Sequence, residues 1–140
     1  MEINCIFCQA SSTGIRIANA LAFAIRDKFP VRPLHTLIIP RRHVSDIFET
    51  SASEREAIHE IATLCRKLIC EENPEVRGFN FGSNVGLVAG QKVMHAHVHL
   101  IPRRSGDAEV PAAVRRAKAC NRMEFSIGEI STGNFDQEVR

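Results

Sequence analysis

The chain has 140 residues and a mass of 15.6 kDa, which is the size of one globular domain. Its formal net charge of +2 is too small to favour a nucleic-acid surface, so we expect no nucleic-acid partner. No apolar run approaches the roughly 20 residues that cross a bilayer and no leader is visible, so we expect a cytoplasmic protein without a membrane partner.

Alternating or continuous apolar runs predict the strands, which we place at residues 16–17, 21–25, 35–39, 78–83, 94–101 and 124–130. The one long helical pattern covers residues 53–71, and a weaker one covers 108–119. Either Ser51 with Glu54 or Ser53 with Glu56 could form a capping box at the start of the long helix.

These elements predict the α+β class, with an antiparallel β-sheet meander and one principal α-helix against a face of the sheet. We find no internal repeat and no linker, and we therefore expect a single domain over residues 1–140. Its core is expected at roughly residues 5–104, and residues 105–140 form a C-terminal segment with weaker patterns.

The cysteines indicate a metal site more than a disulfide framework. Their number, five, is odd, which argues against a closed set of disulfides. Cys5 and Cys8 form a C-x-x-C motif, which in a reducing compartment is either a redox pair or half of a zinc site. No thioredoxin-like pattern surrounds the motif, so we favour zinc, with two buried thiols as the simpler alternative. Cys65 and Cys70 fall in the long helix, where we expect packed thiols.

Three histidines alternate with small or apolar residues in the segment His95-Ala96-His97-Val98-His99. Because a strand sends alternate side chains to opposite faces, this spacing predicts three imidazoles on one side, about 6–7 Å apart. Such a row can hold a metal or contact a phosphate. A strand that simply carries satisfied histidines is the weaker interpretation, since three of the six histidines in the chain fall within five residues.

A glycine-rich segment, residues 82–93, leads directly into the histidine row. Its glycines allow backbone N–H groups to approach an anion closely, and Asn84, Gln91 and Lys92 add amide and basic side chains. Most glycine-rich loops are only turns. One that feeds into three alternating histidines indicates a phosphate cradle.

Residues 90–103, Gly-Gln-Lys-Val-Met-His-Ala-His-Val-His-Leu-Ile-Pro-Arg, resemble the signature of the histidine-triad (HIT) nucleotide-binding family. The resemblance extends upstream through residues 5–8, 21–27 and 33–44, in the order that the family has. It implies an α+β meander that forms a homodimer, with a nucleotide groove on each subunit. It also implies hydrolysis or transfer of a nucleoside monophosphate through a covalent nucleotidyl-histidine.

The resemblance assigns roles to the row and its loop. It makes the middle histidine, His97, the nucleophile, with its ring proton held by the main-chain carbonyl of His95. His99 would donate to the phosphate or to the leaving-group oxygen. Gln91 and the groups before it, with Asn84 at the start of the loop, would bind phosphate oxygens. Lys92 stands where many members have Ser or Thr, which leaves the handling of the leaving group open.

The resemblance also places the nucleoside. Asp27 matches the position whose carboxylate binds the ribose hydroxyls, although a turn-forming Asp is the better interpretation of that residue alone. Phe7, Phe23 and Ile25 fall on positions that line the base pocket, and ordinary core packing explains each of them equally well. We interpret His35 as a supporting hydrogen-bonding residue near the triad.

Relatives with an N-terminal C-x-x-C motif bind zinc with two histidines, one after the Ile-Pro strand and one at the start of the triad. The resemblance therefore implies zinc ligands at Cys5, Cys8, His43 and His95. Such a closed set leaves no open position for water, so the zinc would be structural and no catalytic metal is expected.

The sequence thus predicts a nucleotide hydrolase that attacks the α-phosphate of a dinucleoside polyphosphate or a nucleoside phosphoramidate and releases a nucleoside monophosphate. A nucleotidyl transferase of the same family and a non-catalytic nucleotide sensor are the alternatives. A metal-dependent hydrolase or cupin-like oxygenase is disfavoured, because no suitable carboxylate follows the row and Asp107 lies eight residues past His99.

Overall fold

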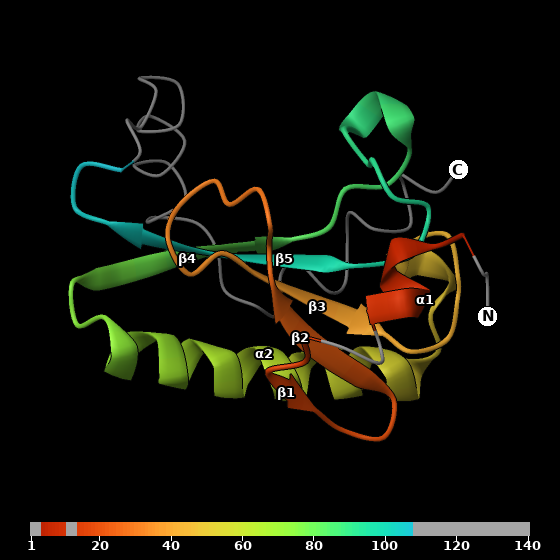
Figure 1. Cartoon of the computed structure of the whole chain (residues 1–140), viewed down its shortest axis with the longest axis horizontal. Helices are drawn as coiled ribbons and strands as arrows, with labels where there is room; N and C mark the ends of the chain where they lie inside the picture. The colour runs from red at the N-terminus through yellow and green to blue at the C-terminus, as the bar shows by residue number, and fades with distance from the viewer. Residues whose placement is uncertain (1–3, 11–13, 108–140) are drawn as a thin grey trace, which may run out of the picture. The chain divides into compact units, whose positions relative to one another are not determined.

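The computed structural model describes residues 4–10 and 14–107, which belong to one compact unit. Five strands form a single sheet with the order β1-β2-β3-β5-β4, and all neighbours are antiparallel (Figure 1). The strands are β1 (Ile17–Ala18), β2 (Ala22–Arg26), β3 (Thr36–Pro40), β4 (Val76–Gly82) and β5 (Val98–Arg104). One long helix, α2 (Ala52–Glu72), runs along one face of the sheet, which confirms the predicted α+β class.

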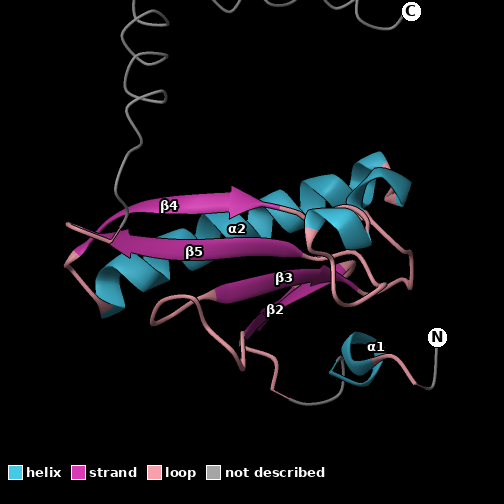
Figure 2. Cartoon of the chain, turned by 90° about the horizontal axis from the view of Figure 1, so that it is seen from above, coloured by secondary structure: helices cyan, strands magenta, loops and turns pink. Residues whose placement is uncertain are grey.

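The strand order puts the histidine segment near the middle of the sheet. The strands β1, β2 and β3 follow one another as a meander, but β5 lies between β3 and β4. The chain therefore passes from β3 through α2 to the edge strand β4, and then returns with β5 to the interior of the sheet. Figure 2 shows β4, β5, β3 and β2 side by side with α2 behind them.

The helix α2 starts at the first of the two predicted capping boxes. The Ser51 hydroxyl accepts from the Glu54 N–H at 3.1 Å, and the Glu54 carboxylate accepts from the Ser51 N–H at 2.8 Å. The helix ends before Asn73, which precedes a proline and has extended backbone angles. Its observed bounds differ by one residue at each end from the predicted 53–71.

Apolar side chains cover both faces of the sheet. On the α2 face, the buried strand residues Ala24, Ile38, Val98 and Leu100 pack against the apolar side of the helix. On the opposite face a second buried cluster is formed by Phe7, Phe23, Leu37 and Ile39. Its first member comes from the short helix α1 (Ile6–Ala10), which the sequence did not predict.

The predicted strand at 94–101 starts later than expected, at Val98. The β3–β5 ladder begins with the pair Ile38–Val98, and just before it the Ala96 N–H donates to the carbonyl of Val44 at 2.7 Å. This contact takes the backbone out of the sheet, so His95 and His97 lie in the segment that enters β5. The predicted helix at 108–119 and strand at 124–130 lie outside the described residues.

Two short 3-10 turns, η1 (Ile47–Glu49) and η2 (Leu87–Ala89), complete the elements of the described residues. The second of them lies within the glycine-rich segment, between β4 and β5. None of the helices in the part of the chain that the structure describes has the length and apolarity to span a membrane.

An ion pair ties the segment after β3 to the start of α2 and generates a prediction. Arg42 contacts the buried Glu54 carboxylate through Nη2 at 2.7 Å and Nε at 3.1 Å. The guanidinium of Arg42 lowers the pKa of the Glu54 carboxyl to about 2. Because the ionised carboxylate also caps the helix, Glu54→Gln should lower the free energy of unfolding by roughly 1–3 kcal/mol near neutral pH.

The sign of the pH dependence follows from that low pKa. The stabilisation by Glu54 is complete above the ordinary carboxyl pKa and is lost as the pH falls toward 2. Urea denaturation should therefore give different midpoints for wild type and Glu54→Gln at neutral pH and converging midpoints in acid. The control is Glu56→Gln, an exposed position two residues along the same helix. Equal effects of the two substitutions would contradict the assignment.

Candidate active site

His95, His97 and His99 gather on one side of the entry to β5, while Val98 and Leu100 point to the other side and into the α2 core. The ring centroids of His97 and His99 lie 5.1 Å apart, closer than the predicted 6–7 Å. The separation of imidazoles from packed apolar residues is therefore as predicted, although only the last of the three histidines is in the strand.

The ring of His97 has a defined tautomer. Its Nδ1 lies 2.7 Å from the main-chain oxygen of His95, and because a carbonyl can only accept, Nδ1 carries the ring proton. The lone pair is therefore on Nε2. The ring packs edge-on against Phe7, at 5.0 Å between centroids, and only 6% of the residue is exposed.

The Nε2 atom of His97 is nevertheless accessible. Within the described residues, the only buried side-chain nitrogen or oxygen without a hydrogen-bond partner belongs to Arg104. His97 Nε2 has no partner among these residues and is not one of the buried unpaired atoms, so solvent or a substrate can reach it. An uncharged imidazole with an accessible Nε2 lone pair can act as a nucleophile.

A hydrogen-bonded chain fixes the neighbouring ring of His99. The N–H of Val31 donates to His35 Nδ1 at 3.1 Å, so the neutral His35 ring carries its proton on Nε2. That nitrogen lies 2.9 Å from His99 Nδ1 and donates to it. His99 consequently carries its own proton on Nε2 and can donate it to a ligand. Burial lowers the pKa of both rings, and for His99 the nearby His97 and His35 lower it further.

Asp27 lies beside this chain and makes a turn at the same time. One carboxylate oxygen accepts from the Phe29 N–H at 2.9 Å, as expected for a turn-forming aspartate. The other lies 3.5 Å from His35 Nε2. Asp27, His35 and His99 thus form a group whose ligand atoms lie within 4.8 Å of one another. A metal bound at His35 Nε2 would move the ring proton to Nδ1, against the Val31 N–H, so the donor set fits a hydrogen-bonded chain better than a metal site.

The glycine-rich loop is braced by side chains. Gly86 and Gly90 have φ angles of 90° and 91°, in the region that favours glycine. A Cβ on Gly90 would lie 3.3 Å from Asn84 Nδ2, which itself donates to the carbonyl of Ala89 at 2.6 Å. These contacts fix the loop between η2 and the histidine row.

Gln91 has a structural role that the sequence did not reveal. Its Oε1 accepts from the Gly86 N–H at 2.9 Å, and its Nε2 donates to the carbonyls of Ser45 and Val93 at 2.6 and 2.9 Å. The residue is only 3% exposed. The side chain therefore holds the loop against the segment after β3, and its predicted contact with a phosphate remains a prediction.

The predicted base-pocket residues differ in exposure. Phe23 is fully buried under α1, so ordinary core packing, one of the two interpretations, accounts for it. Phe7 joins the same cluster and also contacts the ring of His97, whereas Ile25 is only partly buried at its edge. Phe7 and Ile25 are thus the members of the predicted set that lie at the border of the cluster.

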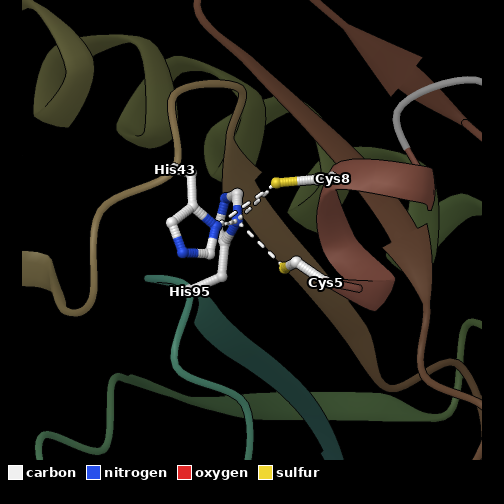
Figure 3. Close-up of side chains that lie close together, drawn as sticks. All are labelled: Cys5, Cys8, His43 and His95. Atoms are coloured by element: carbon white, nitrogen blue, oxygen red, sulfur yellow. Dashed lines mark hydrogen bonds between the residues drawn. The ribbon is translucent and has the colours of Figure 1, made fainter. Parts of the chain in front are cut away.

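The four predicted metal ligands converge at a single point (Figure 3). The Sγ atoms of Cys5 and Cys8 lie 3.5 Å from His95 Nδ1, Cys8 Sγ lies 3.3 Å from His43 Nδ1, and the two Nδ1 atoms are 3.1 Å apart. In a tetrahedral Cys2His2 zinc site the ligand atoms are about 3.3–3.8 Å from one another. The His95 Nε2 donates to the carbonyl of Pro40 at 2.8 Å, which leaves its Nδ1 lone pair facing the cluster. The residues therefore fit a zinc ion.

The sheet, the histidine row and the glycine-rich loop together define an α+β protein of the histidine-triad class. A family model described as the HIT domain matches residues 11–106. The HIT-like protein MG132 of Mycoplasma genitalium is 40% identical over 105 residues, which cover 71% of this chain and 73% of that protein. The adenylylsulfatase HINT3 of Arabidopsis thaliana is 30% identical over 116 residues, which cover 76% of this chain and 56% of that protein. The chain belongs to the HIT domain family.

Solved structures of similar proteins share the fold. A HIT family protein from Bacillus anthracis has a TM-score of 0.70 and 28% identity, over 88% of this chain and 97% of the other. A Zn-bound histidine triad family protein from Mycobacterium smegmatis has a TM-score of 0.68 and 27% identity, over 87% and 99%. A histidine triad nucleotide-binding protein from Candida albicans has a TM-score of 0.64 and 25% identity, over 91% and 100%.

The lowered pKa values of the two linked rings predict a pH-dependent stability. Because His35 and His99 resist protonation in the folded chain and have ordinary pKa values near 6.5 when unfolded, folding is favoured at higher pH and weakened as the pH falls through about 6.5. His99→Asn removes one of these groups. Its free energy of unfolding should change less between pH 7.5 and 5.5 than that of the wild type, as measured by urea denaturation. His59→Gln, at an exposed position on α2, should keep the wild-type slope, and equal slopes for all three proteins would contradict the assignment.

Proposed function

We propose that the protein is a nucleotide hydrolase that attacks the α-phosphate of a nucleoside-phosphate conjugate through Nε2 of His97. The observation that carries the proposal is the 2.7 Å hydrogen bond between His97 Nδ1 and the His95 carbonyl. It holds the proton of the neutral ring away from the accessible nitrogen, so the lone pair is on Nε2.

The reaction has two displacements at phosphorus. First, His97 Nε2 forms a bond to the α-phosphorus while the bond to the leaving group breaks, and Nδ1 keeps its proton on the His95 carbonyl. Water then attacks the same phosphorus, the P–N bond breaks, and a nucleoside monophosphate is released with a regenerated imidazole. The attacking water gives one proton to solvent in this second step. A phosphate or sulfate leaving group departs as an anion and needs no proton, whereas an amine leaving group takes one proton from solvent as its bond to phosphorus breaks.

His99 is proposed to donate a hydrogen bond to the atom on which negative charge develops. The chain from Val31 through His35 leaves the His99 Nε2–H free to turn to a ligand. A donor held in place before the reaction stabilises the transition state more than one that must reorient. Backbone N–H groups of the loop braced by Asn84 and Gln91 would hold the remaining phosphate oxygens.

The nucleoside is proposed to lie on the α1 side of the row. Asp27 offers a carboxylate to the vicinal ribose hydroxyls, and Phe7 and Ile25 offer apolar surface to the base. The family supports this class of substrate, since the resemblance implies nucleotide binding and one relative is named an adenylylsulfatase. Dinucleoside polyphosphates and nucleoside phosphoramidates are the proposed substrates.

We further propose a structural zinc ion held by Cys5, Cys8, His43 and His95. The ion would join α1 and the segment after β3 to the entry of β5, and it would supply folding energy rather than chemistry. The similarity to a Zn-bound histidine triad family protein supports this assignment.

A homodimer is the proposed assembly. The outer edge of β4 pairs with no strand in the described part of the chain. Phe81 on this strand is 50% exposed. An edge strand with an exposed aromatic side chain is a natural site for pairing with a second copy.

The nucleophile is tested with His97→Asn, whose amide can still donate to the His95 carbonyl. We expect kcat/KM for adenosine phosphoramidate and diadenosine triphosphate to fall by at least about 10³-fold, with an unchanged fold and retained nucleotide binding. Product release is measured by chromatography, and the wild type is quenched in acid-free conditions to trap a nucleotidyl-histidine. The exposed His59→Asn serves as the matched control.

Three outcomes would contradict the proposal. Undiminished hydrolysis by His97→Asn would exclude the covalent mechanism. A wild type that binds nucleotides without turning them over would be a sensor, and one that passes the nucleotidyl group to an added acceptor in preference to water would be a transferase.

The zinc proposal predicts one zinc ion per purified chain. Cys8→Ser should lower the metal content and reduce the thermal midpoint by more than about 5 °C, because binding energy is folding energy at such a site. Cys70→Ser, at a partly buried position on α2, should retain the metal. Metal is measured by atomic emission and stability by thermal denaturation. A full zinc content in Cys8→Ser would refute the ligand set.

A further inference from the structure

One residue in the loop between β2 and β3 (orange in Figure 1) has an unusual backbone conformation. Leu34 has a φ of 71°, and within residues 4–10 and 14–107 it is the one residue other than glycine with a positive φ. It lies in a turn that the His35 N–H closes by donating to the carbonyl of Arg32 at 3.1 Å. Pro33 and Leu34 occupy the centre of this turn, as in a type II turn, whose third position favours glycine. A leucine there is strained, so contacts from elsewhere in the chain must hold it.

The side chain of Arg26 supplies such contacts. Its Nη1 donates to the carbonyl of Leu34 at 2.8 Å and to the Thr36 hydroxyl at 3.0 Å. The Thr36 hydroxyl donates to the same Leu34 carbonyl at 2.9 Å, which closes a ring of three hydrogen bonds. The Nη2 of Arg26 contacts the Glu72 carboxylate at the end of α2 at 3.0 Å, so the guanidinium is also held from outside the loop. These bonds fix the Leu34 carbonyl in the orientation that goes with its positive φ.

Arg26 lies on the other side of the sheet from the histidine row. It pairs with Thr36 across β2 and β3, and its guanidinium reaches α2. Because successive residues of an extended chain point to opposite faces, the neighbours of this pair, Asp27 and His35, turn toward the histidine row. The His35 Nε2 is 2.9 Å from His99 Nδ1 and 3.5 Å from an Asp27 carboxylate oxygen. Arg26 therefore contacts no substrate at His99, and it can act on the site only through the backbone.

We infer that Arg26 is a positioning residue, which orders His35 and through it His99 by holding Leu34 in its strained conformation. The inference rests on the proposed function, in which His99 donates a hydrogen bond to the reacting phosphoryl group. It goes beyond that function by assigning a role to a residue on the far face of the sheet.

The backbone connects Leu34 directly to the hydrogen-bonded chain. A relaxation of the Leu34 φ to a negative value would turn the peptide that leads into His35 and would move its ring away from the Val31 N–H. His99 Nδ1 would then lose the proton donor that His35 Nε2 provides. A neutral His99 ring without that donor can carry its proton on Nδ1, and its Nε2 then has no proton to donate to a ligand.

The first test is a double-mutant cycle on the hydrolysis of adenosine phosphoramidate. Arg26→Met should lower kcat about tenfold and leave KM nearly unchanged, because the donor at His99 acts in the transition state. Glycine adopts a positive φ without steric cost, so Leu34→Gly removes the need for the guanidinium. In the Leu34→Gly chain, Arg26→Met should therefore lower kcat by less than about twofold.

The second test needs no turnover. Long-range 1H–15N NMR spectra of the full chain near neutral pH show which ring nitrogen of His99 carries the proton. The wild type should have it on Nε2, Arg26→Met should populate the Nδ1 tautomer, and Arg26→Met combined with Leu34→Gly should return to Nε2. A substitution that only weakens the fold does not change the tautomer of the folded chain, so this readout is specific for positioning.

Arg104→Met is the matched control. Arg104 Nη1 donates to the carbonyl of Pro33 at 3.2 Å, so this variant removes a guanidinium from the same turn without touching the Leu34 carbonyl. It should keep the wild-type kcat and the wild-type tautomer of His99.

Arg26→Lys is a second variant for the case in which Arg26→Met gives no folded protein. Its ammonium keeps the positive charge near Glu72, but it lacks the planar fork that serves the Leu34 carbonyl, the Thr36 hydroxyl and the carboxylate at once. It should change kcat and the His99 tautomer in the same direction as Arg26→Met, to a smaller extent.

The outcomes separate the positioning role from the proposed function. An unchanged His99 tautomer in the Arg26 variants, or the same change in Arg104→Met, would overturn the positioning role. A fall in kcat that Leu34→Gly does not relieve would overturn it as well. An unchanged kcat despite a changed tautomer would overturn the donation by His99. A wild type that does not hydrolyse adenosine phosphoramidate would overturn the proposed function, and the tautomers would still decide whether Arg26 orders His99.

Discussion

Main-chain carbonyls beside the histidine row fix which ring nitrogen carries the proton in His95 and in His97. The carbonyl of His95 takes the Nδ1 proton of His97, and the carbonyl of Pro40 takes the Nε2 proton of His95. Identical rings two residues apart therefore present opposite nitrogens to their surroundings. His99 receives its proton arrangement from His35 instead. His95 is therefore suited to bind a metal, His97 to attack phosphorus and His99 to donate a hydrogen bond, although the three side chains are of the same type.

The end of β3 and the start of β5 make these carbonyl contacts available. The ladder between the two strands stops at the pair Ile38–Val98, so the residues beyond it no longer need to pair with one another. Pro40 still pairs with Ala22 on its other side, and its carbonyl accepts from the His95 ring. A strand that continued through residue 95 would use these main-chain carbonyls for hydrogen bonds within the sheet. The late start of β5 is thus a condition of the site.

Local signals in the sequence predicted the parts of the fold that depend on near neighbours. The apolar stripe located α2 to within one residue at each end, and the alternation around Val98 and Leu100 separated the packed side chains from the imidazoles. The resemblance brought together Cys5, Cys8, His43 and His95, whose side chains come from three separate segments and cluster in the structure. Local pattern could not predict the insertion of β5 between β3 and β4, because strand order depends on which distant edges pair.

The same limit applies to the bracing of the loop and to the surroundings of His99. Gln91 reaches the carbonyl of Ser45, forty-six positions earlier in the chain, and the space beside His99 exists because β4 presents Gly82 at that register. The two neighbours of His99 in the sheet differ. Leu37, its partner on β3, is buried, whereas a Cβ built on Gly82, its partner on β4, would meet nothing within 4 Å. The surroundings of His99 are therefore set by the register of β4 against β5, which no pattern of near neighbours in the sequence contains.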